Sequence, residues 1–252
     1  CLQMVYEFAG TAAHAAGNPW DGRSALDGAE MMNMGVQFLR EHMEPKCSIH
    51  YSIADAGGIS PNVVQPKAKL VYMVRAETVR KAKALLARVN DIAKGAALMS
   101  GTEVTWHQLD GTSDTLSNTV LEELLYKNLQ EAPMPEYTAD ERQFAADLRK
   151  TYPHEGLPGD NVETNPVLRK QIAALSDKGQ KDINDFVVPY YPAYHYSPGS
   201  TDVGDVSWLT PTSQVDIVTW PAGMPHHSWQ AVSCGKSGFA HKGLLMAAKV
   251  LA

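Results

Sequence analysis

The sequence predicts an α/β fold with a ferredoxin-like domain in residues 1–112, followed in residues 113–252 by part of a second α/β domain. Over the first part the predicted elements follow the order β-α-β-β-α-β, which is the split βαβ arrangement. After Gly111 this regular order gives way to helical segments separated by proline-broken stretches. A chain of 252 residues is long enough for two such pieces.

The elements of the first domain follow from the spacing of apolar residues. Alternating apolar residues rich in β-branched and aromatic side chains predict strands. Apolar residues at helical spacing predict two helices, the first of which has Ser24 as its N-cap. In chain order we expect a strand at 2–10, a helix at 24–43, strands at 47–55 and 67–76, a helix at 78–99 and a strand at 102–111.

The second part contains fewer elements than a complete α/β domain needs. Its expected helices cover residues 118–129, 139–152, 167–176 and 238–252. Residues 186–205 are strand-like but broken by prolines, and residues 213–220 predict a buried strand. Between the helices, residues 153–166 are rich in turn formers and predict a surface excursion. Because the chain also begins with Cys1, we expect it to be the later part of a longer protein.

Composition and charge exclude several classes of partner. With a net charge of −6, the chain lacks the basic surface that binding to nucleic acid or an anionic membrane requires. No apolar run reaches the roughly 18 residues that span a bilayer. Cys1, Cys47 and Cys234 are far apart and show no CxxC spacing, so neither a disulfide framework nor a thiolate zinc site is indicated. We therefore expect a reducing, cytoplasmic location.

Three polar residues of the first domain are candidates for chemistry. His14 follows a predicted strand and precedes a Gly-Asn-Pro turn; the alternative is a surface or capping histidine. Asn62 lies in GGISPNVVQP, where its amide can donate and accept; alternatively it forms an Asx-turn with its own backbone. Arg75 lies near a strand end and can grip a carboxylate, or it is an ordinary exposed arginine.

Two further candidates lie in the second part. In SPGSTDVGDVSW, at 197–208, small hydroxyl residues and glycines around Thr201 predict a pocket for an anionic end group, or an ordinary surface turn. Asp202 and Asp205 lack the alternation and terminal glutamate of a calcium loop, so that interpretation is rejected. His226 and His227 are adjacent; in an extended segment their side chains point oppositely, so only one of them can ligate a metal.

Five ordered stretches give the chain a resemblance to a known family. They are AAHAAGNPWDGRSALD, GGISPNVVQP with VRA, STDVGDVSW, HHSWQ and AHKGLLMAAK. Together they resemble the dinuclear-metal aminoacylase and glutamate-carboxypeptidase peptidases. The resemblance implies a catalytic α/β domain interrupted by a ferredoxin-like lid through which the enzyme forms a homodimer. It also implies two zinc or manganese ions that share a water, which attacks the amide carbonyl of an N-acyl amino acid such as aminobenzoyl-glutamate.

Matching the motifs position by position implies roles for individual residues. His227 would be the C-terminal metal ligand. His14 would stabilise the oxyanion in the partner subunit's cleft. Asn62 and Arg75 would hold the substrate carbonyl or carboxylate, and three residues would line the pocket: Ser200, Thr201 and Asp202.

The chain departs from the family in its metal ligands. The family's glycine-, histidine- and cysteine-rich ligand loop, its paired glutamates and its Trp-His-Pro strand are absent. One histidine cannot hold two metals, so we expect the chain to be inactive without an N-terminal half or a second, related subunit. The alternative function is a non-catalytic dimerisation or regulatory module. The joint presence of His14, Asn62, Arg75 and His227 favours the hydrolase.

Overall fold

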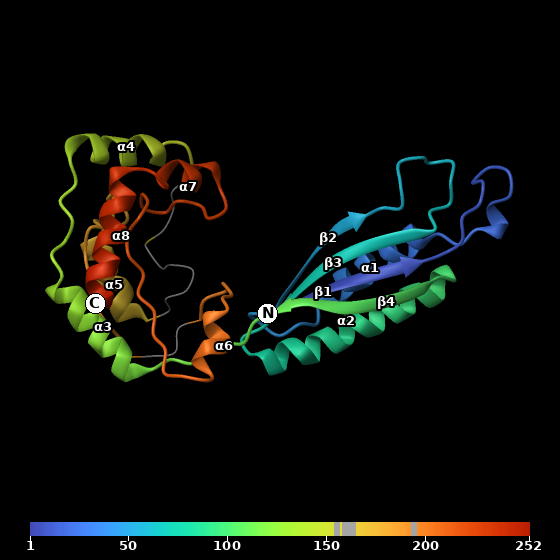
Figure 1. The fold of residues 1–252 in the computed structure, drawn as a ribbon, viewed down its shortest axis with the longest axis horizontal. Helices are drawn as coiled ribbons and strands as arrows, with labels where there is room; N and C mark the ends of the chain where they lie inside the picture. Colours follow the sequence, from blue (N-terminus) through green and yellow to red (C-terminus); the bar gives the residue numbers. More distant parts are fainter. Residues whose placement is uncertain (154–156, 158–164, 193–195) are drawn as a thin grey trace. The chain divides into compact units, whose positions relative to one another are not determined.

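The computed structural model describes residues 1–153, 157, 165–192 and 196–252, which form two compact units (Figure 1). Unit 1 consists of Cys1–Thr115 together with Pro198–Trp208. Unit 2 consists of Leu116–Ser197 and Leu209–Ala252. Most of the turn-rich stretch expected at 153–166 lies outside the described residues. No helix in the described ranges is long and apolar enough to cross a membrane.

Unit 1 has the expected ferredoxin-like architecture. Its sheet is antiparallel, with strand order β2-β3-β1-β4, and α1 and α2 pack on it (Figure 1). The elements are β1 (Leu2–Ala9), α1 (Ala25–Arg40), β2 (Ser48–Asp55), β3 (Lys67–Arg75), α2 (Val79–Ser100) and β4 (Glu103–Gly111). The α/β fold class and the order β-α-β-β-α-β are therefore confirmed.

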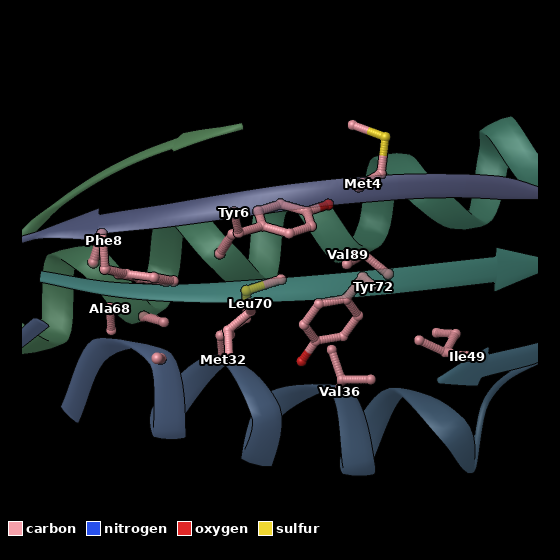
Figure 2. Packing of buried hydrophobic residues seen from close by; sticks show 14 of the residues in the cluster. Met4, Tyr6, Phe8, Met32, Val36, Ile49, Ala68, Leu70, Tyr72 and Val89 are labelled. Carbon is pink, nitrogen blue, oxygen red and sulfur yellow. The ribbon is translucent and has the colours of Figure 1, made fainter. Parts of the chain in front are cut away.

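The core of unit 1 lies between the sheet and its two helices (Figure 2). In β1 and β3 the even-numbered residues face the helices. The antiparallel register pairs Tyr6 with Leu70 and Phe8 with Ala68, so these partners lie on the same face of the sheet. Met32 and Val36 of α1 and Val89 of α2 complete the layer and are fully buried. Each such side chain contributes about 1.5–3 kcal/mol of stability through its burial.

The two helices of unit 1 begin within one residue of their expected starts; α2 also ends within one residue of the expected position, whereas α1 ends at Arg40, before the expected residue 43. Ser24 precedes α1, and its Oγ accepts a hydrogen bond from the backbone N–H of Asp27 at 3.1 Å. Thr78 caps α2 in the same way. Gly101 ends α2 with a φ of 66°, a conformation that glycine adopts without steric cost. Local capping therefore fixes both helices before any tertiary contact is considered.

Unit 2 is helical in its described part. Its helices are α3 (Thr119–Glu131), α4 (Ala139–Arg149), α5 (Pro166–Leu175), α7 (Trp229–Cys234) and α8 (Gly238–Leu251). They surround two small clusters of buried side chains. One contains Tyr137, Ala145, Ile183 and Phe239, and the other contains Leu148, Tyr152, Met224 and Cys234.

Two strand predictions were wrong. Residues 213–220 pair with no strand in the described part of the chain, and none of them is fully buried. The stretch 186–205 contains no strand in its described residues, and its end enters the short helix α6 (Val203–Ser207). A strand needs a neighbour to satisfy its backbone hydrogen bonds, and the described part of unit 2 provides none.

Candidate functional site

His14 and Asn62 lie on two loops that leave the same end of the sheet in unit 1. Residues 10–23 follow β1 and residues 56–66 precede β3, and we call these two segments the tip loops. Ala9, which precedes the first loop, pairs with Lys67, which follows the second. The Ala15 N–H donates to the carbonyl oxygen of Asn62 at 2.9 Å. His14 and Val63 also form an isolated β-bridge. Backbone contacts therefore bring these two predicted site residues together.

The hydrogen bonds of His14 define which ring nitrogen is available. Its Nδ1 accepts from the backbone N–H groups of Gly17 at 2.9 Å and Ala16 at 3.2 Å. Since Nδ1 acts as an acceptor, the proton of the neutral ring resides on Nε2. The ring thus caps its own turn, as the alternative interpretation of the sequence expected, and also presents Nε2–H as a donor. The histidine and the side chain of Asn62 both have solvent access.

A close backbone approach holds the first tip loop in place. Thr11 and Arg23 exchange two backbone hydrogen bonds, of 2.8 and 2.9 Å. A Cβ on Gly10 would lie 2.0 Å from the carbonyl oxygen of Arg23, so only glycine fits there. The sequence "AGTAAHAAGNPWDGR" therefore encodes a closed loop that starts from a glycine and carries the histidine at a fixed position.

Arg75 lies at the opposite end of the sheet from the tip loops. It is the last residue of β3, and a nine-residue strand spans about 26 Å. Its Nη1 donates to the carbonyl oxygen of Pro198 at 2.8 Å, and Nε and Nη2 contact the Sδ of Met73. The structure therefore separates Arg75 from His14 and Asn62.

Arg75 instead lies with residues 198–208, which we call the clasp segment. The backbone N–H of Ser113 donates to Asp205 at 3.1 Å, and the Nε1 of Trp208 donates to the carbonyl oxygen of Asp114 at 2.8 Å. These bonds hold the clasp segment to residues 1–115 of unit 1, from which it is distant along the chain. The predicted pocket residues lie on this segment: Ser200, Thr201 and Asp202. Thr201 Oγ1 bonds Asp202 Oδ1 at 3.3 Å.

His227 belongs to unit 2, and its backbone is not extended. It has a φ of 55°, a left-handed conformation that is uncommon for histidine. It is followed by Ser228, whose Oγ accepts from the Ala231 N–H and caps α7. His226 packs its ring edge-on against Trp220, with the ring centroids 5.2 Å apart. His227 is exposed, so its ring is accessible to a ligand.

The described residues do not form a metal centre. No group of three or more histidine, cysteine, aspartate or glutamate side chains converges within these residues. Burial raises the pKa of the Cys234 and Cys47 thiols, which disfavours the thiolate form that binds zinc. His227 by itself does not fit a site for two ions.

Two exposed apolar residues of the tip loops were missed by the sequence analysis. Trp20 is 71% exposed and Ile59 is 101% exposed. The signal was available, because both lie close to a candidate polar group or turn, in GNPWDG and GGISPN.

Comparison with known proteins relates unit 1 to peptidase dimerisation domains. Residues 2–99 match the family described as the peptidase dimerisation domain. The whole chain is 38% identical over 253 residues to one of the subunits of the p-aminobenzoyl-glutamate hydrolase of Escherichia coli K12, covering 100% of this chain and 52% of that protein. The resemblance that the five motifs indicate is therefore confirmed by similarity over the whole chain. It spans about half the length of this relative.

Other relatives match shorter parts of the chain. An Xaa-Arg dipeptidase of Mus musculus is 35% identical over 101 residues, covering 40% of this chain and 23% of the relative. Among solved structures, an aminobenzoyl-glutamate utilization protein from Klebsiella pneumoniae has a TM-score of 0.44 and 22% identity. That match covers 52% of this chain and 33% of the other.

Proposed function

We propose that this chain supplies the dimerisation domain and a C-terminal catalytic segment of a metal-dependent amidohydrolase. The proposed reaction splits the amide of an N-acyl amino acid, with p-aminobenzoyl-glutamate giving p-aminobenzoate and glutamate. The 38% identity to a component of a p-aminobenzoyl-glutamate hydrolase across the whole chain supports this substrate. The observation that carries the proposal is the tip geometry, in which the Nδ1 of His14 is held by backbone N–H groups beside Asn62.

His14 and Asn62 have the chemistry of an oxyanion site. As water adds to the amide carbonyl, negative charge develops on its oxygen, and Nε2–H of His14 and the amide of Asn62 can donate to it. One such donor contributes about 10²–10³ in kcat. Because the backbone contacts of the tip loops fix the ring, little reorganisation accompanies the reaction.

Arg75 and the clasp segment have the chemistry of a carboxylate site. A guanidinium grips a carboxylate through paired N–H donors, and Ser200 and Thr201 add hydroxyl groups close in sequence to Pro198, which Arg75 contacts. Since β3 alone spans about 26 Å, Arg75 and His14 of one chain cannot contact the same small amide. In the proposed homodimer, Arg75 therefore serves one active site and His14 serves the partner subunit's site.

The metal would activate the attacking water, and His227 is the single ligand that we assign to this chain. The other ligands would come from residues outside those described. An alternative function, a non-catalytic dimerisation or regulatory module, is favoured by the lack of a converging ligand cluster in the described residues. Two equivalents of zinc or manganese in the protein that the gene encodes would support the hydrolase, and a metal-free protein would support the module.

The hydrolase is tested by substituting His14 in that protein. His14→Ala should lower kcat for p-aminobenzoyl-glutamate about 100-fold or more, because it removes the oxyanion donor. Size-exclusion chromatography should show an unchanged dimer, since the side chain has solvent access and lies outside the core of unit 1. His50→Ala, at another histidine of unit 1, is the matched control and should retain activity. Equal turnover of the His14 variant and the wild type would refute the assignment.

A further inference from the structure

The two tip loops that carry the proposed oxyanion donors also carry large exposed apolar side chains. Trp20, Ile59 and Val63 are 71%, 101% and 39% exposed. Val63 follows Asn62 directly and bridges to His14. The backbone of Val64 also bonds Ala13 at 3.0 Å, so both loops present one combined surface. Exposed apolar groups on the same surface loops as polar donors are typical of a ligand-binding site.

The exposure of Trp20 does not come from a loosely held loop. Trp20 lies in the 3-10 turn η1 (Pro19–Asp21), which the Gly22 N–H closes on the Pro19 carbonyl at 3.0 Å. Asn18 Nδ2 donates to Asp21 at 3.0 Å, and Arg23 Nη1 donates to the Trp20 carbonyl at 3.1 Å. A braced turn that holds an indole in water has preorganised that side chain for contact with another molecule.

The second loop is equally well defined around Ile59. Gly57 and Gly58 have φ values of 83° and 118°, and the Gly57 N–H donates to Asp55 at 2.8 Å. The Val63 N–H closes a turn on the Ser60 carbonyl. These contacts hold Ile59 fully outside the protein although its burial would be favourable.

We propose that Trp20 and Ile59 form an apolar rim that binds the acyl group of the substrate, and that this rim selects aromatic acyl groups. The inference rests on the proposed function, because it places the rim beside the carbonyl that His14 and Asn62 bind. The acyl substituent is one bond from that carbonyl carbon, so it must lie next to the oxyanion donors. The carboxylate of the amino acid is assigned to Arg75 and is remote from the rim. An indole face favours a flat aromatic group over a small aliphatic one.

The test compares two amides that differ only in the acyl group, N-(4-aminobenzoyl)-glutamate and N-acetyl-glutamate, with the protein that the gene encodes. Trp20→Ala should lower kcat/KM for the aromatic amide about tenfold, mainly through KM, and change the acetyl amide less than about twofold. Trp20→Phe should restore most of the preference. If the acetyl amide is not turned over, its inhibition constant against the aromatic amide replaces kcat/KM.

The matched control is Phe38→Ala, which removes a 65% exposed aromatic side chain from α1, away from the tip loops. It should leave the ratio between the two amides unchanged. An unchanged ratio in Trp20→Ala would overturn the rim while leaving the proposed function intact. An equal loss for both amides would also overturn it and would indicate that Trp20 packs against the partner subunit. A wild-type protein that hydrolyses neither amide would overturn both proposals.

Discussion

At the scale of single residues, a buried phenol ties unit 2 together and gives it a defined response to pH. The Oη of Tyr152 donates to the carbonyl oxygen of Ala222 at 3.0 Å, and the side chain lies in the cluster with Leu148 and Met224. Burial raises the pKa of Tyr152 from 10.0 to about 12. The neutral phenol donates this bond, whereas the phenolate would be both desolvated and unable to donate.

This shift predicts a loss of stability at alkaline pH. The pKa of Tyr152 is higher in the folded state, so its contribution is complete below pH 10 and is lost as pH rises towards 12. At pH 11 the loss is about 1 kcal/mol. Urea unfolding at pH 8 and pH 11 should therefore show a smaller decrease in the free energy of unfolding for Tyr152→Phe than for the wild type. Parallel decreases in the two proteins would contradict the assignment.

At the scale of elements, the clasp segment is held against residues 1–115 by a close backbone contact, although it is distant from them in sequence. A Cβ on Gly204 would lie 2.2 Å from the carbonyl oxygen of Ser113, so α6 can approach this backbone only because residue 204 is glycine. The approach lets Asp205 accept from the Ser113 N–H and lets Trp208 donate to the Asp114 carbonyl. The carboxyl group of Asp114 in turn accepts from the first N–H of α2, at Val79.

Gly204→Ala should release the clasp segment from residues 1–115 of unit 1. The backbone of Ser113 cannot move aside cheaply, so the hydrogen bond to Asp205 should break, and amide exchange at Ser113 should accelerate about tenfold or more. Amides of β1 and β3 should keep their protection, because the core between sheet and helices does not involve the clasp segment. The control is Gly95→Ala in α2, where an added methyl meets nothing within 4 Å. It should stabilise unit 1 by about 0.5–1 kcal/mol.

Elements that depend on local signals were predictable from the sequence, and elements that depend on a distant neighbour were not. The helices α1 and α2 have side-chain caps at Ser24 and Thr78 and clear apolar spacing, and the structure confirms both. Residues 213–220 have the composition of a strand but no partner within the described part of unit 2. The helix α7 has six residues, too few for an apolar periodicity to appear.

The same distinction applies to the candidate site. His14 and Asn62 were chosen separately for their side-chain chemistry, and their proximity emerges only when β1 pairs with β3. Arg75 is separated from these two residues because it is the last residue of β3, whereas Asn62 lies in the loop that precedes the first residue of that strand. Sequence spacing alone gives no indication that Arg75 and the clasp segment belong together, because that contact joins residues 123 positions apart.

At the scale of the whole molecule, the chain combines two units with separate cores. The core of unit 1 is one continuous layer between its sheet and helices, and the described part of unit 2 contains two small clusters. Three groups of proposed functional residues are distributed over the two units. The tip loops and the Arg75 end belong to unit 1, and His227 belongs to unit 2. In the proposed homodimer, a complete active site would combine such groups from two chains.

This arrangement makes mixed dimers informative. If His14 serves the partner subunit's site and Arg75 serves its own, a dimer of His14→Ala with Arg75→Ala has one site with both defects and one intact site. Random reassembly of equal amounts gives half mixed dimers, so about a quarter of the wild-type activity should return from two inactive proteins. The mixture is unfolded and refolded together, and activity is measured with p-aminobenzoyl-glutamate.

Mixing His14→Ala with Asn62→Ala should restore no activity, because both residues lie on the same tip loops and each mixed site keeps one defect. Recovery in that control, or none in the first mixture, would show that the two ends of the sheet do not serve different sites.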